Sequence, residues 1–257
     1  MKEFFGFGGY LREPEGFFSW QHIVFVTSLI LIMIGLAVYL GLKNKDKDIS
    51  KKNKVLIWAA FLIDGFELFK IILCAVRAND ASNMLMNLPL FLCSIQLITI
   101  PLAAFSKGRL KEASLDFVFI FGILGALLGT YGAGQNYGSY PVLSFDNVVS
   151  GITHCISGFS SLYIVISKME SMKKNNIIIT LSILFGFCIT AFIVNYLIDY
   201  NYMFLRRGDG TPYDIFYNLV NGNQVLYPLI VVGLFVVYIA LFYYVYFLIK
   251  NRKNKAN

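Results

Sequence analysis

Long apolar segments alternate with short polar linkers along the whole chain. Seven of these segments approach the roughly 20 residues that a helix needs to cross a bilayer, and tilting accommodates small departures from that length. We predict helices over residues 20–43, 54–78, 85–105, 115–131, 147–167, 176–198 and 225–249. The pattern therefore predicts an all-α, polytopic membrane protein with seven transmembrane helices.

The predicted helices leave a terminal segment at each end of the chain. Residues 1–19 mix aromatic side chains with glycines and charges, which is typical of a segment lying at the membrane interface. Residues 250–257 form a basic tail. We therefore expect an interfacial segment (1–19), a seven-helix domain (20–249) and a tail (250–257). Residues 131–146 lack Lys and Arg and are rich in Gly and Tyr, which predicts an outer loop.

Composition excludes a water-soluble globule. The chain is 57% hydrophobic and only 14% charged, whereas a soluble domain carries charge on roughly a quarter of its residues. The net charge of +7 does not indicate a nucleic-acid partner, because the basic residues gather at segment ends rather than on one face. All four cysteines fall within apolar stretches, so we expect free thiols rather than a disulfide framework.

The basic residues alternate between linkers, and this alternation predicts the orientation of the chain. One set of linkers and the C-terminus carry most of them, namely Lys43, Lys45, Lys47, Lys51, Lys52, Lys54, Lys107, Arg109, Lys111, Lys168, Lys173, Lys174, Lys250, Arg252, Lys253 and Lys255. The opposite side carries only Lys2, Arg12, Arg77, Arg206 and Arg207. Because cytoplasmic loops are enriched in Lys and Arg, we predict an outer N-terminus and a cytoplasmic C-terminus.

Ionisable residues inside an apolar helix are costly, so they mark candidate sites. Asp64, Glu67 and Lys70 recur every three residues in the second predicted helix and share one face. One interpretation is an ion pair that only holds helices together. The other is a role in proton transfer or in binding a substrate. The sequence leaves both open.

A cysteine and a histidine form the second candidate site. Pro89, Cys93 and Gln96 lie on one face of the third predicted helix. Counting about 1.5 Å per residue from the outer side places Cys93, His154 and Lys70 at about 12 Å depth. The only other histidine, His22, begins the first helix at the interface, where a polar tip needs no function.

A thiol beside an imidazole permits nucleophilic catalysis, because histidine can accept the thiol proton and the thiolate can attack an ester carbonyl. Gln96 and Asn195 are candidate hydrogen-bond donors to an oxyanion. Arg206 and Arg207 lie in a polar outer loop at the end of the same helix as Asn195. We predict no metal site and no cofactor, since no paired Cys or His spacing and no glycine-rich phosphate loop occurs.

Three strings in the chain carry a resemblance to a known family: FFSWQHIVFV, NLPLFLCSIQL and NYMFLRR. They resemble the YwaF-like bacterial integral membrane proteins. That group is similar to eukaryotic transmembrane acyltransferases that move fatty acyl chains between glycerophospholipids, and to membrane hydrolases of the androgen-induced-gene type. The resemblance implies a nucleophilic cysteine at Cys93 and a partner histidine at His154. It also implies residence in a bacterial plasma membrane.

Two functions follow as expectations. The first is a lipid-modifying enzyme, a cysteine-dependent phospholipid acyltransferase or acyl hydrolase whose partners are phospholipids or lysophospholipids. The alternative is a noncatalytic protein that binds or transports an ion or a small polar molecule through Asp64, Glu67, Lys70 and His154. A purely structural assembly partner is a third possibility. The sequence does not indicate an oligomeric state.

Overall fold

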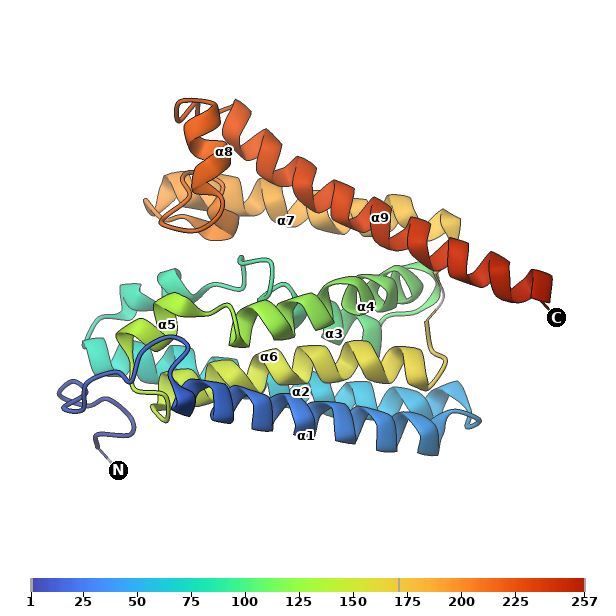
Figure 1. Cartoon of the computed structure of the whole chain (residues 1–257), viewed down its shortest axis with the longest axis horizontal. Helices are drawn as coiled ribbons and strands as arrows, with labels where there is room; N and C mark the ends of the chain where they lie inside the picture. The colour runs from blue at the N-terminus through green and yellow to red at the C-terminus, as the bar shows by residue number, and fades with distance from the viewer. Residues whose placement is uncertain (1, 171, 257) are drawn as a thin grey trace. The chain divides into compact units, whose positions relative to one another are not determined.

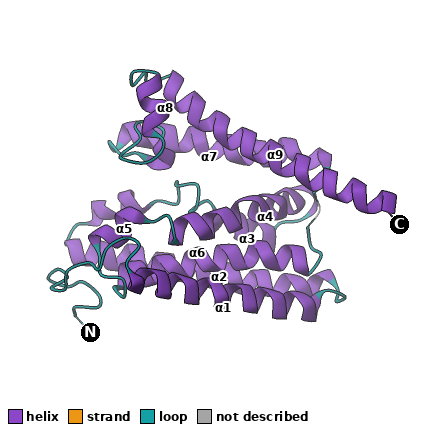
Figure 2. Ribbon diagram, viewed as in Figure 1, coloured by secondary structure: helices purple, strands orange, loops and turns teal. Residues whose placement is uncertain are grey.

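The computed structural model describes residues 2–170 and 172–256, and this part of the chain contains helices and loops but no strand (Figure 2). The chain divides into two compact units. The first comprises Met1–Pro89 and Cys93–Ser171, and the second comprises Leu90–Leu92 and Met172–Asn257. Each unit is described by itself.

The first unit contains six α-helices and one 3-10 helix in its described part. In chain order they are α1 (Trp20–Asn44), α2 (Ile49–Ala78), η1 (Ala81–Asn87), α3 (Gln96–Phe105), α4 (Gly108–Thr130), α5 (Gly134–Ser139) and α6 (Phe145–Ile166). Helix α6 is central, because it packs against α4, α1 and α2 (Figure 1). Helix α3 packs against α4 and α2.

Local capping explains where two of these helices begin. Ser19 accepts a hydrogen bond from the backbone N–H of His22 at 3.2 Å and caps α1. Ser144 does the same for α6 by accepting from the N–H of Asn147 at 3.3 Å, and Asp146 adds a negative charge in the first turn. Both starts lie within two residues of the predicted ones.

Small residues allow α4 and α6 to approach closely. A Cβ placed on Gly122 would come within 2.7 Å of the Ser157 carbonyl oxygen, and one on Gly158 within 2.6 Å of the Ala126 Cβ. Larger side chains would force the two backbones apart. The contact between α4 and α6 is therefore built on glycine, alanine and serine rather than on bulky side chains.

The second unit contains η2 (Lys174–Asn176), α7 (Ile177–Leu197), η3 (Tyr202–Phe204), α8 (Asp214–Leu219) and α9 (Leu226–Ala256). Helices α7 and α9 are joined by a 3.2 Å hydrogen bond between the Thr180 and Tyr243 hydroxyls. Phe91 also belongs to this unit and packs edge-on against Tyr202, with ring centroids 5.1 Å apart.

Five helical segments, rather than the predicted seven, are long and apolar enough to cross a membrane in the described part of the chain. They are Trp20–Asn44, Gly108–Ser139, Phe145–Ile166, Lys174–Leu197 and Leu226–Arg252. Helix α2 has the length, but it carries charges from its first turns onward. The predicted helix over 85–105 is wrong in form, because α3 begins only at Gln96 and has 10 residues. The orientation of the chain stays a prediction.

Pro89 gives a physical reason why no continuous helix runs through Leu88. Proline lacks an N–H donor and disfavours helical geometry in the residue before it, and Leu88 accordingly has extended backbone angles. The chain is irregular from Leu88 until α3 begins. Cys93 therefore lies in this irregular stretch, and the predicted helical face shared by Pro89, Cys93 and Gln96 does not exist.

The N-terminal segment is fastened to the first unit by a buried polar cluster. Arg77 donates two hydrogen bonds to the carboxylate of Asp146, at 2.7 and 3.0 Å. Tyr10 donates its hydroxyl to the same carboxylate, and Arg77 also reaches the Phe5 carbonyl oxygen at 3.2 Å. Because α2 supplies Arg77 and α6 supplies Asp146, this cluster joins three parts of the chain.

Candidate active site

A small polar pocket lies between α2, α6 and the stretch that leads into α3. Its volume is about 50 Å³, and its walls include Glu67, Lys70, Cys93, Thr153 and His154. One water molecule needs roughly 10–15 Å³ of such space, so the pocket has room for a few small groups. The structure thus brings four sequence-predicted residues to one place: Cys93, His154, Glu67 and Lys70.

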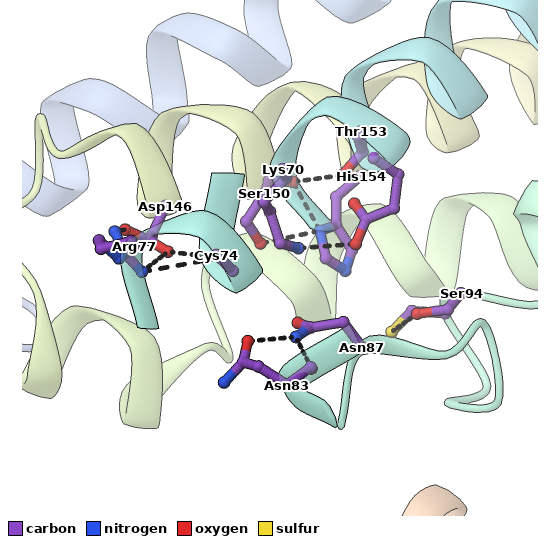
Figure 3. Close-up of polar contacts among 12 residues, drawn as sticks. Lys70, Cys74, Arg77, Asn83, Asn87, Ser94, Asp146, Ser150, Thr153 and His154 are labelled. Carbon is purple, nitrogen blue, oxygen red and sulfur yellow. Dashed lines mark hydrogen bonds and ion pairs between the residues drawn. The ribbon is translucent and has the colours of Figure 1, made fainter. Parts of the chain in front are cut away.

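His154 is oriented by its own helix. Its Nδ1 lies 2.7 Å from the carbonyl oxygen of Ser150, one turn earlier on α6 (Figure 3). A carbonyl oxygen only accepts, so this contact assigns the ring hydrogen of the neutral imidazole to Nδ1. Nε2 is then left with a lone pair that can take a proton. The Ser150 carbonyl therefore orients the imidazole, a role that a carboxylate has in many other sites.

Cys93 and His154 line the same pocket, and the thiol and the imidazole interact electrostatically. Ser94 is a weaker neighbour, with its hydroxyl 4.0 Å from the Cys93 sulfur. Since Nδ1 is engaged by Ser150, the ring nitrogen available to the thiol is Nε2.

Two glycines of α4 make room for these side chains. A Cβ on Gly129 would lie 1.8 Å from Cδ2 and 2.1 Å from Nε2 of His154, which no real contact allows. One turn earlier, a Cβ on Gly125 would lie 3.8 Å from the Cβ of Cys93. Imidazole and thiol therefore rest on the same face of α4, and only glycine at 129 permits the imidazole to be there.

Glu67 and Lys70 form an ion pair in the same pocket, with Lys70 Nζ 2.7 Å from Glu67 Oε1. Both side chains are mostly buried. Their separation by three residues places them on one helix face, as the sequence predicts. The ammonium group of Lys70 also acts electrostatically on His154. The Lys70 ammonium group therefore places a positive charge near the imidazole, with the Glu67 carboxylate beside it.

The remaining predicted site residues lie elsewhere. Asp64 and Gln96 are not among the residues lining this pocket. Gln96 is fully buried, and its side-chain oxygen accepts a 3.0 Å hydrogen bond from Thr99. Its Nε2 has no hydrogen-bond partner among the described residues.

Asn195, Arg206 and Arg207 belong to the second unit and hold its loop. The side chain of Asn195 forms two hydrogen bonds with the backbone of Tyr202: its Oδ1 accepts from the N–H at 2.6 Å, and its Nδ2 donates to the carbonyl oxygen at 3.0 Å. Arg206 pairs with Asp199, and its hydrogen bond holds the pKa of that carboxyl below the ordinary value. Arg207 pairs with Asp209 at 2.6 Å. All three side chains thus have local structural partners.

The sequence analysis did not predict the structural role of His22. We expected its side chain to lie at the membrane interface, but it is fully buried. Its Nδ1 accepts from the N–H of Phe18 at 3.1 Å, and Nε2 lies 3.1 Å from the carbonyl oxygen of Thr130. Tyr137 packs on the ring, with centroids 4.0 Å apart. His22 therefore ties the start of α1 to the end of α4, next to Gly129.

Within residues 2–170 and 172–256, no group of three or more His, Cys, Asp or Glu side chains is arranged to hold a metal ion. All four cysteines are free, which confirms the prediction that they form no disulfides.

Comparison with known proteins gives one match. Neither a curated protein nor a solved structure matches the chain. A family model covers residues 17–255, which is nearly the whole sequence and includes every residue of the pocket. The chain therefore belongs to the TMEM164 family, a family of membrane proteins.

Proposed function

We propose that this protein is an integral membrane enzyme that transfers or hydrolyses the acyl groups of phospholipids, with Cys93 as nucleophile and His154 as general base. The observation that supports it best is that Cys93 and His154 line one pocket, with Nδ1 of the imidazole already engaged by Ser150. The resemblance to YwaF-like proteins and to membrane acyltransferases and hydrolases points to the same reaction.

The first half-reaction forms a thioester. Nε2 of His154 takes the proton of the Cys93 thiol, and the sulfur attacks an ester carbonyl of a phospholipid. The tetrahedral intermediate collapses by breaking the bond between the carbonyl carbon and the alkoxy oxygen. That oxygen takes the proton back from the imidazolium and leaves as the hydroxyl of a lysophospholipid.

The second half-reaction releases the acyl group. A hydroxyl of a lysophospholipid, or water, gives its proton to Nε2 and attacks the thioester carbonyl. The carbon–sulfur bond breaks, and the sulfur recovers the proton as a thiol. Transfer results when the acceptor is a lysophospholipid, and hydrolysis results when it is water. Histidine acts as base and as acid in both halves.

The volume of the pocket and the charge of Lys70 both suit an ester carbonyl group. A space of about 50 Å³ admits a small group such as an ester carbonyl. Lys70 lines the same pocket, and in this proposal its ammonium group stabilises the negative charge that develops on the carbonyl oxygen of the tetrahedral intermediate. Glu67 holds Lys70 in that position.

The alternative function, binding of an ion or a small polar molecule without catalysis, draws on the same pocket. The Glu67–Lys70 pair and the small volume suit a proton or a water molecule. The two proposals differ in one respect: only the enzyme forms a covalent bond to a lipid.

Intact-mass analysis after incubation with phospholipid separates them. We expect the purified protein to gain the mass of one acyl group, and hydroxylamine to remove it. Cys93→Ser should fold, since sulfur and oxygen differ little in volume, and should lose turnover, because a hydroxyl stays protonated where a thiol ionises. His154→Ala should accumulate less thioester.

Cys188→Ala is the matched control, because Cys188 is a buried free thiol of the second unit. It should retain the acyl mass and the turnover of the wild type. An acyl mass that persists in Cys93→Ser, or equal turnover in all cysteine variants, would reject the acyl-enzyme and favour the binding protein.

A further inference from the structure

A second, apolar groove lies on the opposite face of α6 from the polar pocket. Its volume is about 340 Å³, and α1, α2 and α6 form its walls. Ile152, Cys155, Ile156 and Phe159 of α6 line the groove, whereas Thr153, His154 and Ser157 line the pocket. These two sets point to opposite sides of a helix with 3.6 residues per turn. The groove is thus a separate site.

The size and lining of the groove suit a hydrocarbon chain. An apolar cavity of roughly 150 Å³ holds a benzene molecule, so this groove accommodates a chain of several carbons. Apart from the indole of Trp58 and the thiol of Cys155, the lining side chains are hydrocarbon or thioether groups, which leaves a polar ligand with few hydrogen-bonding partners there. Trp58 lines it with 68% of its surface exposed.

The length of the groove matches one leaflet. On α1 it runs from Leu29, near the middle of the helix, to Leu40 in its penultimate turn. Eleven residues at about 1.5 Å each give roughly 16 Å, and half of the hydrocarbon core of a bilayer is about 15 Å. The occupant is therefore a chain of one leaflet, lying along α1 with its polar end near the α1–α2 connection.

That connection is strongly basic. It carries Lys43, Lys45, Lys47, Lys51, Lys52 and Lys54 against only two acidic residues, Asp46 and Asp48. Lys43 follows the groove residue Leu40 by three positions, and Lys51 precedes Val55 by four, so helical periodicity places both lysines on the groove side. Both are exposed, and neither forms an ion pair with Asp or Glu within residues 2–170.

We propose that the groove between α1, α2 and α6 binds an anionic phospholipid, with one acyl chain along Leu29–Leu40 and the phosphate at Lys43 and Lys51. The charge at one end and the apolar lining along the rest complement a negatively charged amphiphile. This lipid is not the acyl donor, because α6 separates it from Cys93 and His154.

The two tryptophans of the chain make the proposal testable with the protein's own fluorescence. Trp58 lines the groove, and Trp20 begins α1 nine residues before the groove starts. In the Trp20→Phe variant, Trp58 is the only tryptophan. This variant is reconstituted in phosphatidylcholine vesicles that contain a minor fraction of either phosphatidylglycerol or phosphatidylcholine with brominated acyl chains, which quench indole on contact.

We expect brominated phosphatidylglycerol to quench Trp58 with a roughly 25-fold higher relative affinity than brominated phosphatidylcholine, about fivefold for each of the two lysines. Lys43→Gln with Lys51→Gln should abolish the preference. Lys173→Gln with Lys174→Gln removes the same charge from the other unit and should preserve it. The Trp58→Phe variant, in which only Trp20 reports, should show no preference.

Three results would overturn the proposal. Equal quenching of Trp58 by the two lipids would mean that ordinary bilayer lipid fills the groove. A preference that survives loss of both lysines would exclude the phosphate site. No quenching of Trp58 by either lipid would mean that protein, such as a second copy of the chain, covers it. None of these results bears on the acyl-enzyme, which is measured by mass at Cys93.

Discussion

The imidazole of His154 occupies the space that a side chain at Gly129 would need. A Cβ at that position would lie 1.8 Å from the ring carbon Cδ2. Because Gly129 of α4 has no side chain, the imidazole of His154 on α6 fits against α4 at this point. The relationship makes Gly129 a positioning residue for the proposed base, without any contact of its own with a substrate.

Gly129→Ala should therefore impair the proposed reaction while sparing most of the fold. The added methyl group displaces the imidazole from Cys93, and we expect a loss of thioester formation of at least about tenfold, since small misplacements of a catalytic group cost up to about a hundredfold. Gly186→Ala is the control, because a Cβ there meets nothing within 4 Å. Intact-mass analysis and thermal unfolding measure the two effects. Unchanged thioester formation in Gly129→Ala would contradict the positioning role.

The Glu67–Lys70 pair should be more costly to break than to replace as a unit. Changing both residues to Met removes two charges and leaves apolar side chains of similar length, and buried pairs replaced in this way are often neutral. Lys70→Met alone leaves the Glu67 carboxylate without its partner and should destabilise by about 2–4 kcal/mol. Thermal unfolding in detergent compares the two variants. Equal stability of the single and the double variant would argue against the pair.

The Arg77–Asp146 pair should hold the N-terminal segment against the helices. Asp146→Asn weakens two charge-assisted hydrogen bonds from Arg77, so we expect a loss of about 2–4 kcal/mol. The segment should also become accessible to protease. The control is Arg12→Gln, which removes a pair that is half exposed and should cost under about 1 kcal/mol. Proteolysis that is unchanged in Asp146→Asn would show that other contacts hold the segment.

Tyr10 should make this attachment sensitive to alkaline pH. Burial, together with the hydrogen bond to Asp146, raises the pKa of Tyr10 to about 12 from an ordinary value of 10. The folded protein thus favours the protonated phenol. The stabilisation is complete below pH 10, and it is lost as the pH rises from 10 towards 12. Thermal unfolding at pH 9 and pH 11 should show a larger decrease for the wild type than for Tyr10→Phe. Equal decreases would contradict this assignment.

Hydrophobic length alone predicted most of the fold. Helices α1, α6 and α7 begin and end within two or three residues of the predicted bounds, because an apolar stretch of about 20 residues has few alternatives to a helix in a bilayer. The same criterion failed over 85–105. The apolar composition of this segment does not show that Pro89 disfavours a helix through Leu88. The helix starts only at Gln96, and Cys93 lies before it.

For the candidate site, the sequence indicated which residues to consider, and the tertiary structure decided which of them meet. Residue counting grouped Cys93, His154 and Lys70, and one pocket does contain all three, although the count for Cys93 assumed a helix from residue 85 that the structure does not have. Which helix faces which is not encoded locally, because it depends on packing between segments far apart in the chain. The Ser150 carbonyl that orients His154, the space left by Gly129 and the burial of His22 therefore became visible only in three dimensions.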